Sequence, residues 1–228
     1  VGEKTTDAVR IAGRIMSIRN SGMFIDLRDP TGKVQVYTNL KEISETQQQF
    51  LKLLDIGDII GIDGVIRRTP RGELTVDSTL ITLLCKSLRP LPEKRHGLVD
   101  PEERYRGREA DLIANENSRR IFRQRAQILH FMRAMLNERG FIEVETPILQ
   151  NIPGGALARP FVTHHNTLDI PLYLRIATEL HLKRMLIGDV AEGVFEIGRI
   201  FRNEGVSVKH NPEFTSIELY QAYADYHD

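Results

Sequence analysis

The chain has 228 residues, of which 41% are hydrophobic and 27% are charged, and its formal net charge at pH 7 is zero. This length allows one or two domains that each bury a core, and the composition is ordinary for a globular protein. No apolar run approaches the roughly 20 residues of a membrane span, so no membrane partner is expected. The single Cys85 excludes an internal disulfide and a multi-cysteine zinc site. A reducing, cytoplasmic setting is therefore predicted.

The first 87 residues are predicted to form a small all-β barrel. The alternation of apolar and polar residues and the turn signals predict five strands and one short helix. The strands are Val9–Ile18, Gly22–Arg28, Lys33–Thr38, Gly57–Arg67 and Glu73–Leu84, and the helix is Glu45–Leu54. Three strands, a helix and two strands is the order of an OB-fold, a barrel that often binds oligonucleotides.

An α+β domain with an antiparallel sheet is predicted for residues 117–228, after an inter-domain linker at residues 88–116 that is rich in proline and charge. A long helix should begin near Asn117 and Ser118, which are good N-caps, and end at Gly140. The remaining elements expected are strands Phe141–Thr146 and Tyr173–Ala177, helix Thr178–Ile187 and a hairpin from Val194 to Tyr223.

Several common catalytic motifs are absent from the sequence. It contains no G-x-x-x-x-G-K-[ST] loop, no G-x-G-x-x-G and no H-E-x-x-H. The adjacent His164 and His165 would point to opposite faces of a strand, so they cannot chelate one metal ion together. We therefore predict no metal-ligating residue in this chain.

The hairpin presents chemically useful side chains on one face. Alternation places Arg202 and Glu204 on one face and Phe195, Ile197 and Phe201 on the other. In the return strand, one face is shared by Phe214, Ser216, Glu218 and Tyr220. An arginine suits phosphate oxygens, and a carboxylate beside a phenol suits an ammonium group. Alternation alone would favour a solvated sheet face with salt bridges, and the specific sequence overturns that interpretation.

The segments Phe201–Gly205 and His210–Thr215 resemble motif 2 of the class II aminoacyl-tRNA synthetases. The run Glu218–Tyr226 resembles the lysyl-tRNA synthetases of subclass IIb in particular. So do Ile152–Ala156, Arg159–Phe161, Leu174–Ala177, Glu179–Leu180, Ala12–Arg14 and Leu88–Pro92. The end of the long helix with Gly140–Pro147 resembles motif 1, the dimerisation element of the family. The resemblance covers nearly the whole chain. It implies an anticodon-binding OB-fold followed by an incomplete class II catalytic fold.

This resemblance implies that lysine is activated by ATP with Mg²⁺ and then transferred to the 3′ end of tRNA(Lys) by a homodimer paired through the motif 1 helix and strand. Arg202 would hold the α-phosphate, Glu204 would face the adenine amino group, and Phe214 would stack on the ring. His210, with Asn211 also among the ATP-binding residues, would approach the terminal phosphates.

For lysine, the resemblance puts Gly155 and Glu179 at the α-amino group and Glu218 with Tyr220 at the ε-ammonium. An apolar substrate side chain would leave a buried carboxylate unpaired, so this arrangement is a good selector. Glu179 has a second interpretation, as an acid in the first turn of a helix that complements the helix dipole.

The barrel carries an outward aromatic residue. Met23, Ile25 and Leu27 share the apolar phase, so Phe24 points to the other side, where it can stack on a base or cover the barrel rim. The resemblance implies that the anticodon uridines are read by Arg19, Phe24, Gln35 and Glu73. The segment Arg19–Gly22 is shorter than the usual family pattern, which makes Arg19 the least secure of these assignments.

Three alternatives stay open. An aspartyl- or asparaginyl-tRNA synthetase shares these motifs, but its substrate would not require the acid at Glu218. A lysine ligase acting on a protein factor typically lacks the OB-fold. The chain could also be a catalytically silent tRNA-binding or dimerising fragment, because motif 3 is absent before Asp228. We accordingly expect the magnesium ligands beyond Asp228 and little or no activity from these 228 residues alone.

Overall fold

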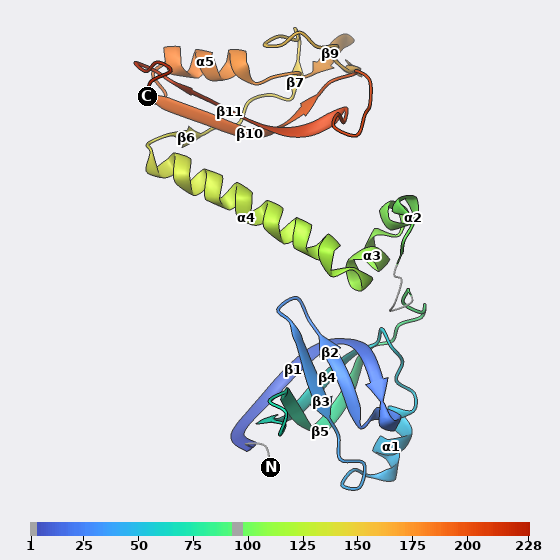
Figure 1. The fold of residues 1–228 in the computed structure, drawn as a ribbon. Helices are drawn as coiled ribbons and strands as arrows, with labels where there is room; N and C mark the ends of the chain where they lie inside the picture. Colours follow the sequence, from blue (N-terminus) through green and yellow to red (C-terminus); the bar gives the residue numbers. More distant parts are fainter. Residues whose placement is uncertain (1–3, 93–97) are drawn as a thin grey trace. The chain divides into compact units, whose positions relative to one another are not determined.

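Two units make up the structure, Val1–Arg120 and Ile121–Asp228, and each is described by itself. The computed structural model describes residues 4–92 and 98–228 (Figure 1). Among these residues, no helix has the length and apolar character needed to cross a bilayer.

Five strands close into a barrel in the first unit (Figure 1). They are β1 (Lys4–Arg19), β2 (Phe24–Arg28), β3 (Lys33–Tyr37), β4 (Ile59–Arg68) and β5 (Leu74–Cys85). Helix α1 (Glu45–Leu51) lies between β3 and β4 and is capped by Ser44, whose Oγ accepts the Gln47 N–H at 3.3 Å. The predicted OB-fold is confirmed, with every predicted strand and the helix present.

The pairing of these strands explains how the barrel closes. β1 is long enough to pair with β2 and also with β4, while β3 pairs in parallel with β5. Alternating residues point inward and form a core in which Ile15, Ile25, Leu27 and Ile60 are almost fully buried. Gly64 lies at a register shift in the antiparallel pairing of β4 with β5, and a Cβ there would collide with the Asp77 carbonyl. Only glycine allows this close approach of the two backbones.

The predicted linker contains two short helices that the sequence analysis did not predict. They are α2 (Pro101–Arg106) and α3 (Arg108–Ala114), while residues 93–97 of the linker lie outside the described residues. Asp111 on α3 is fully buried and accepts hydrogen bonds from Arg104 Nε at 2.9 Å and Arg108 Nη1 at 3.1 Å. The limits proposed for the linker, residues 88 and 116, stay a prediction.

The second unit contains two three-stranded sheets and two helices. One sheet has the order β11-β10-β6, and the other has the order β7-β9-β8. The elements are α4 (Glu116–Glu138), which begins in the first unit, β6 (Ile142–Glu143), β7 (Leu149–Gln150), β8 (Val162–His165), β9 (Ile170–Leu174), α5 (Glu179–Ile187), β10 (Gly193–Phe201) and β11 (Glu213–Gln221). The predicted α+β architecture is therefore confirmed.

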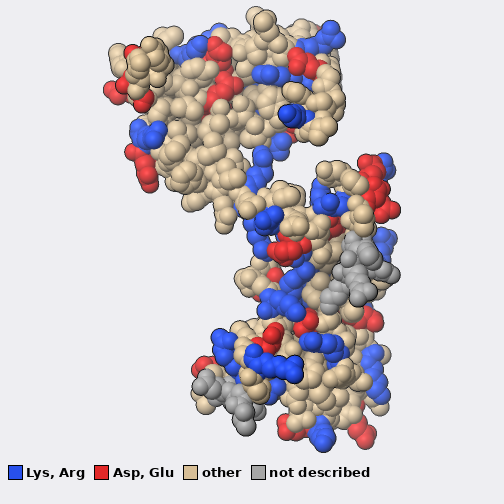
Figure 2. All heavy atoms as spheres, in the orientation of Figure 1, with Lys and Arg blue, Asp and Glu red and all other residues tan. Residues whose placement is uncertain are grey.

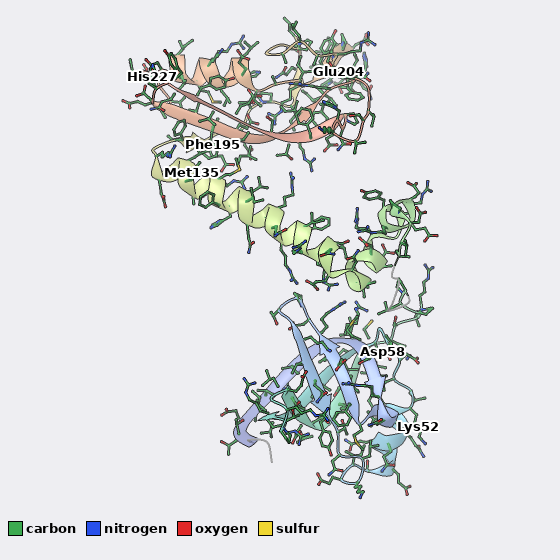
Figure 3. All side chains as sticks on the ribbon, in the orientation of Figure 1. Lys52, Asp58, Met135, Phe195, Glu204 and His227 are labelled. Atoms are coloured by element: carbon green, nitrogen blue, oxygen red, sulfur yellow. The ribbon has the colours of Figure 1, made fainter. Side chains whose placement is uncertain are left out.

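The C-terminal end of α4 and helix α5 lie on opposite faces of the β10–β11 hairpin (Figure 1). On the α4 side, Phe195 is fully buried against Leu136 and Phe141, and Met135 packs beside them (Figure 3). Gly140 ends this helix region with φ at +84°, and the Phe141 N–H bonds back to the Leu136 carbonyl. This hydrophobic layer leaves the α5 side of the hairpin for polar side chains.

Two strand predictions in this unit were wrong in extent. Only Ile142 and Glu143 of the segment 141–146 form a strand, and it pairs in parallel with β10. Strand β9 ends at Leu174 instead of residue 177. The Arg175 N–H bonds to the Ile148 carbonyl and its carbonyl accepts the Phe201 N–H, so its backbone groups join other segments instead of extending the strand.

Candidate active site and nucleic-acid interface

The hairpin face toward α5 has the composition that alternation predicts. In the register of β10 and β11, Tyr220 lies opposite Val194, Glu218 opposite Glu196 and Phe214 opposite Ile200. Ile217 belongs to the other face and packs on the hydrophobic cluster beneath α4. The shared face of Phe214, Ser216, Glu218 and Tyr220 is thus confirmed. Phe214 and Tyr220 are six residues apart, roughly 20 Å along a strand.

Carboxylates gather at the Tyr220 end of this face, under the first turn of α5. Glu218 Oε1 accepts the Thr178 N–H at 3.2 Å, and the Tyr220 hydroxyl donates to Glu218 Oε2 at 3.3 Å. Lys183 Nζ lies 2.6 Å from Glu179 Oε1 and 5.4 Å from the Tyr220 ring centroid. The Thr178 hydroxyl is buried and, among the described residues, has no hydrogen-bond partner.

Gly155 joins this cluster through its backbone. Its φ is +89°, and a Cβ there would come within 3.0 Å of the Ala177 Cβ and 3.3 Å of the Glu179 Cβ. A side chain would be strained in this conformation and crowded against the start of α5. The structure therefore brings together all four residues predicted for lysine, which are Gly155, Glu179, Glu218 and Tyr220.

The phenol of Tyr220 is electrostatically perturbed. Burial raises the pKa of Tyr220 to about 12, and the nearby carboxylates of Glu218 and Glu179 act in the same direction. The phenol consequently stays protonated at neutral pH and serves as a hydrogen-bond donor beside two carboxylates.

The other end of the face holds two of the residues predicted for ATP. The Arg202 Cζ lies 5.4 Å from the centroid of the Phe214 ring, and its Nε donates to the Ile176 carbonyl at 3.4 Å. A cation over an aromatic face is an attractive arrangement, and it leaves most of the guanidinium donors available.

The other residues predicted for ATP lie on the connection between β10 and β11, and the shared face predicted for Arg202 and Glu204 stays a prediction. Regular alternation does not continue to Glu204, because β10 ends at Phe201 and the Arg202 N–H bonds to the Pro212 carbonyl. Glu204 is exposed in a bend of this connection (Figure 3). His210 is also exposed, and its Nδ1 lies 2.8 Å from Ser207 Oγ. Asn211 is exposed beside it.

A buried polar network beside Glu218, on the same face of the hairpin, was not predicted. Arg175 is ion-paired with Glu196, and its Nη1 donates to Thr146 Oγ1 at 3.1 Å. The Thr146 hydroxyl donates to Glu196 Oε2 at 2.6 Å. A Cβ at Gly198 would collide with the Arg175 guanidinium, so a side chain there would displace Arg175 from this network. Because Glu196 lies opposite Glu218 in the register, this network anchors three distant segments on the same face as Glu218.

On the barrel, the four residues predicted to read the anticodon surround one hollow of about 640 Å³. It is lined by Arg19, Asn20, Phe24, Gln35, Thr69, Pro70, Arg71 and Glu73. The Phe24 ring packs at 5.2 Å from the Tyr37 ring, and the Arg19 guanidinium lies 6.0 Å from the Phe24 centroid. The inward phase is confirmed, since Ile25 and Leu27 are buried in the barrel core.

Charge is distributed without a dominant sign. Figure 2 shows Lys and Arg interspersed with Asp and Glu over the face in view. Among the described residues, no group of three or more His, Cys, Asp and Glu side chains is placed to hold a metal ion. His164 pairs with Asp169 at 3.1 Å, while His165 Nδ1 accepts the Leu168 N–H.

Two family models of known proteins match the barrel and the region that contains the hairpin. Residues 100–228 match the family model of tRNA synthetases class II (D, K and N), and residues 9–84 match that of the OB-fold nucleic acid binding domain.

Curated relatives are similar over nearly all of this chain. Proteins named lysine–tRNA ligase include one from Rhizobium meliloti, 56% identical over 97% of this chain and 45% of its own length. Those of Oceanobacillus iheyensis and Pseudomonas aeruginosa are 56% and 57% identical over 99% and 96% of this chain. The chain covers 46% and 43% of these two proteins, so it spans less than half the length of the relatives it matches. Since the class II model matches more than half of the chain, the chain belongs to the class II tRNA synthetases of the D, K and N group.

Proposed function

We propose that this chain is part of a lysine–tRNA ligase that activates L-lysine with ATP and transfers it to the 3′ end of tRNA(Lys). The cluster of Gly155, Glu179, Glu218 and Tyr220 is the observation that carries the proposal. Two carboxylates and a protonated phenol suit a substrate with two ammonium groups. Three curated relatives with this printed name support it.

The proposed roles follow the positions of the groups. Glu218 and the Tyr220 hydroxyl bind the ε-ammonium, and Glu179 with the Gly155 backbone binds the α-amino group. Gly155 approaches the start of α5 so closely that its backbone lies next to Glu179. The buried Thr178 hydroxyl, which has no hydrogen-bond partner among the described residues, offers a further polar atom beside Glu218.

ATP is proposed to bind at the Arg202 end of the same face. Arg202 holds the α-phosphate and stabilises the charge that develops when the lysine carboxylate attacks it. Phe214 stacks on adenine, Glu204 faces the adenine amino group, and His210 with Asn211 approaches the terminal phosphates. The roughly 20 Å between Phe214 and Tyr220 accommodates a nucleotide and an amino acid placed end to end. Alignment of the two substrates supplies much of the rate enhancement.

Magnesium is proposed on the chemistry of the family alone. The described residues contain no cluster of carboxylates that fits a metal ion, so no step is assigned to magnesium on these residues. Its role in the family is to neutralise charge on the phosphates of ATP.

The barrel is proposed to bind the anticodon of tRNA(Lys) through Arg19, Phe24, Gln35 and Glu73. Their shared hollow and the match to a nucleic-acid-binding OB-fold support this assignment. We also propose a cytoplasmic homodimer that is paired through α4 and the strand that follows it, since α4 carries exposed apolar side chains.

The proposal is tested by lysine-dependent ATP–pyrophosphate exchange with the full-length protein. Glu218→Gln should raise the KM for lysine about 10- to 100-fold, because hydrogen bonds to charged groups contribute about 1.5–3 kcal/mol. The KM for ATP should change little, since Glu218 lies far along the strand from Phe214. Glu192→Gln, the same change at an exposed residue just before β10, is the matched control and should leave both constants unaltered.

Other outcomes would identify the alternatives. Exchange that depends on aspartate or asparagine in place of lysine would assign the chain to another member of its group. An unchanged lysine KM in Glu218→Gln would refute the pocket assignment. No exchange with any amino acid would favour the silent tRNA-binding module.

A further inference from the structure

We propose that Asp26 and Thr75 are positioning residues that lock the Arg19 and Gln35 side chains in one orientation, so that the barrel accepts uracil and rejects cytosine. This inference rests on the proposed anticodon function. It adds two residues and a mechanism of base discrimination that the roles proposed above do not contain.

Asp26 anchors the Arg19 side chain. Its carboxylate is 6% exposed and accepts hydrogen bonds from Ser17 Oγ at 2.6 Å and Arg19 Nη2 at 3.0 Å, with Lys33 Nζ at 3.1 Å. Burial alone would raise the pKa of Asp26, but the hydrogen bonds and the charges of Lys33 and Arg19 outweigh it and lower that pKa. The carboxylate therefore stays charged and holds Arg19, which would otherwise be a mobile surface side chain.

A chain of hydrogen bonds continues from Arg19 across the hollow. Arg19 Nη2 also donates to Gln35 Oε1 at 3.1 Å, and Gln35 Nε2 donates to Thr75 Oγ1 at 3.2 Å. The Thr75 hydroxyl is fully buried and donates in turn to the Glu73 carbonyl at 3.4 Å. Gln35 and Thr75 are register partners in the parallel pairing of β3 with β5, so the contact is built into the sheet.

The partners at the two ends favour one orientation of the Gln35 amide. Arginine is a donor only, so the Gln35 atom that faces Arg19 must be the oxygen. The Thr75 hydroxyl donates to the Glu73 carbonyl and accepts from the Gln35 nitrogen. Rotating the amide by 180° would set nitrogen against the guanidinium, and the Thr75 hydroxyl could then bond the amide oxygen only by giving up its bond to the Glu73 carbonyl. Asp26 and Thr75 thus act at the two ends to prevent the flip.

A fixed amide distinguishes the two pyrimidines. Within the described part of the chain, the Gln35 amide keeps a second N–H and a second acceptor position without a partner, beside the hollow that Phe24 also lines. The Watson–Crick edge of uracil offers an N–H donor next to a carbonyl acceptor, which is complementary to an amide held this way. Cytosine offers a ring acceptor next to an amino donor, which is complementary to the flipped amide. The locked orientation therefore selects uracil.

The test measures aminoacylation of tRNA(Lys) transcripts by the full-length protein. One transcript keeps its anticodon uridines, and each of the others carries cytidine in place of one of these uridines. Thr75→Val removes the hydroxyl but keeps the shape. We expect the uridine-to-cytidine ratio of kcat/KM at one position to fall by about fivefold or more, the lower end of what one bidentate base contact contributes. Charging is normalised to the lysine-dependent pyrophosphate exchange of the same variant.

Three further variants make the result specific. Thr75→Ser restores a hydroxyl and should restore the ratio. Thr79→Val, on the same strand, loses a hydroxyl that donates to the Asp63 carbonyl at 3.1 Å outside the hollow, and it should keep the ratio. Asp26→Asn should lower the ratio from the other end of the chain, which keeps the inference testable if Thr75→Val does not fold.

The Gln35→Ala variant separates the anticodon assignment from the positioning roles of Asp26 and Thr75. If Gln35→Ala leaves the charging of every transcript unaltered, the anticodon assignment itself is wrong. If Gln35→Ala abolishes discrimination while Thr75→Val and Asp26→Asn keep it in full, the assignment stands and the positioning roles are wrong.

Discussion

Lys183 supplies a lysine side chain to the pocket proposed for lysine. Its ammonium pairs with Glu179 at 2.6 Å and lies over the Tyr220 ring. The residue stands four positions after Glu179, so the pair was visible in the helical spacing, but the contact with Tyr220 depends on how α5 packs on β11. The Lys183 ammonium thus lies within the pocket proposed for the ammonium groups of the lysine substrate.

We predict that Lys183→Met lowers the KM for lysine about twofold, because an exposed pair four residues apart on a helix contributes about 0.3–0.5 kcal/mol and competes with the substrate. The KM is read from lysine-dependent pyrophosphate exchange in the full-length protein. A raised KM would show instead that Lys183 holds Glu179 in its binding position. Lys183→Arg keeps the charge and serves as the control.

Side-chain direction was predictable wherever a strand is regular. The face of Phe214 and Glu218 follows from alternation, because β11 runs unbroken from Glu213 to Gln221. Glu204 could not be placed in this way, since β10 ends before it. Thr75 and Val76 are both buried on β5, so alternation does not reveal that the Thr75 hydroxyl supports Gln35. Such roles depend on the neighbouring strand and not on the local sequence.

Among the elements, helix α4 carries one apolar stripe with two different environments. Ile121, Ile128 and Met135 recur every seven residues and so lie on nearly the same side of the helix. Met135 packs on the cluster around Phe195, whereas Ile121 and Ile128 are 61% and 58% exposed. A stripe that is buried at one end and uncovered at the other supports the proposed pairing of two copies through α4.

We predict that Ile128→Asp dissociates the proposed homodimer, since a charge buried without a partner costs roughly 3–5 kcal/mol. The mass of the full-length protein, measured by light scattering at micromolar concentration, should fall from that of a pair to that of one chain. His130→Asp adds a carboxylate on roughly the opposite side of the helix and should keep the pair. An unaltered mass in Ile128→Asp would place the dimer contact elsewhere.

Helices α2 and α3 show what periodicity cannot detect. They have six and seven residues, too few for an apolar stripe to repeat, and their proline and charge are typical of a linker. Asp111, buried among Arg104 and Arg108, helps to hold them in place. The barrel strands were predictable because each alternates over several residues against one hydrophobic core.

On the scale of the whole molecule, buried aspartates are concentrated in the first unit. Asp26, Asp58 and Asp111 are at most 6% exposed. Burial alone would raise the pKa of each, but in each case the hydrogen bonds and nearby cations outweigh burial and lower it. For Asp58 these partners are the Asp55 and Ser87 N–H groups and Lys86.

The lowered pKa values of these aspartates determine how the stability of the fold changes with pH. A carboxylate with a lower pKa in the folded state stabilises the fold above its ordinary pKa, and this contribution is lost as the pH falls below about 4. We predict that the melting temperature of the first unit drops on acidification from about pH 6 to about pH 3. Asp58→Asn should flatten this drop, whereas Asp7→Asn, at an exposed residue of the barrel, should not. Thermal unfolding followed by circular dichroism checks both, and a pH-independent melting temperature would contradict the prediction.

Strand β11 forms one edge of its sheet in the described part of the chain. Its outward N–H and C=O groups can pair with the same strand of a second copy about a twofold axis. The proposed pairing through α4 has a twofold axis of its own. One self-complementary contact closes at two copies, but two different ones on the same molecule generate an unlimited row. A closed pair through α4 therefore requires that the β11 edge does not pair with another copy, because pairing at both contacts would produce a filament.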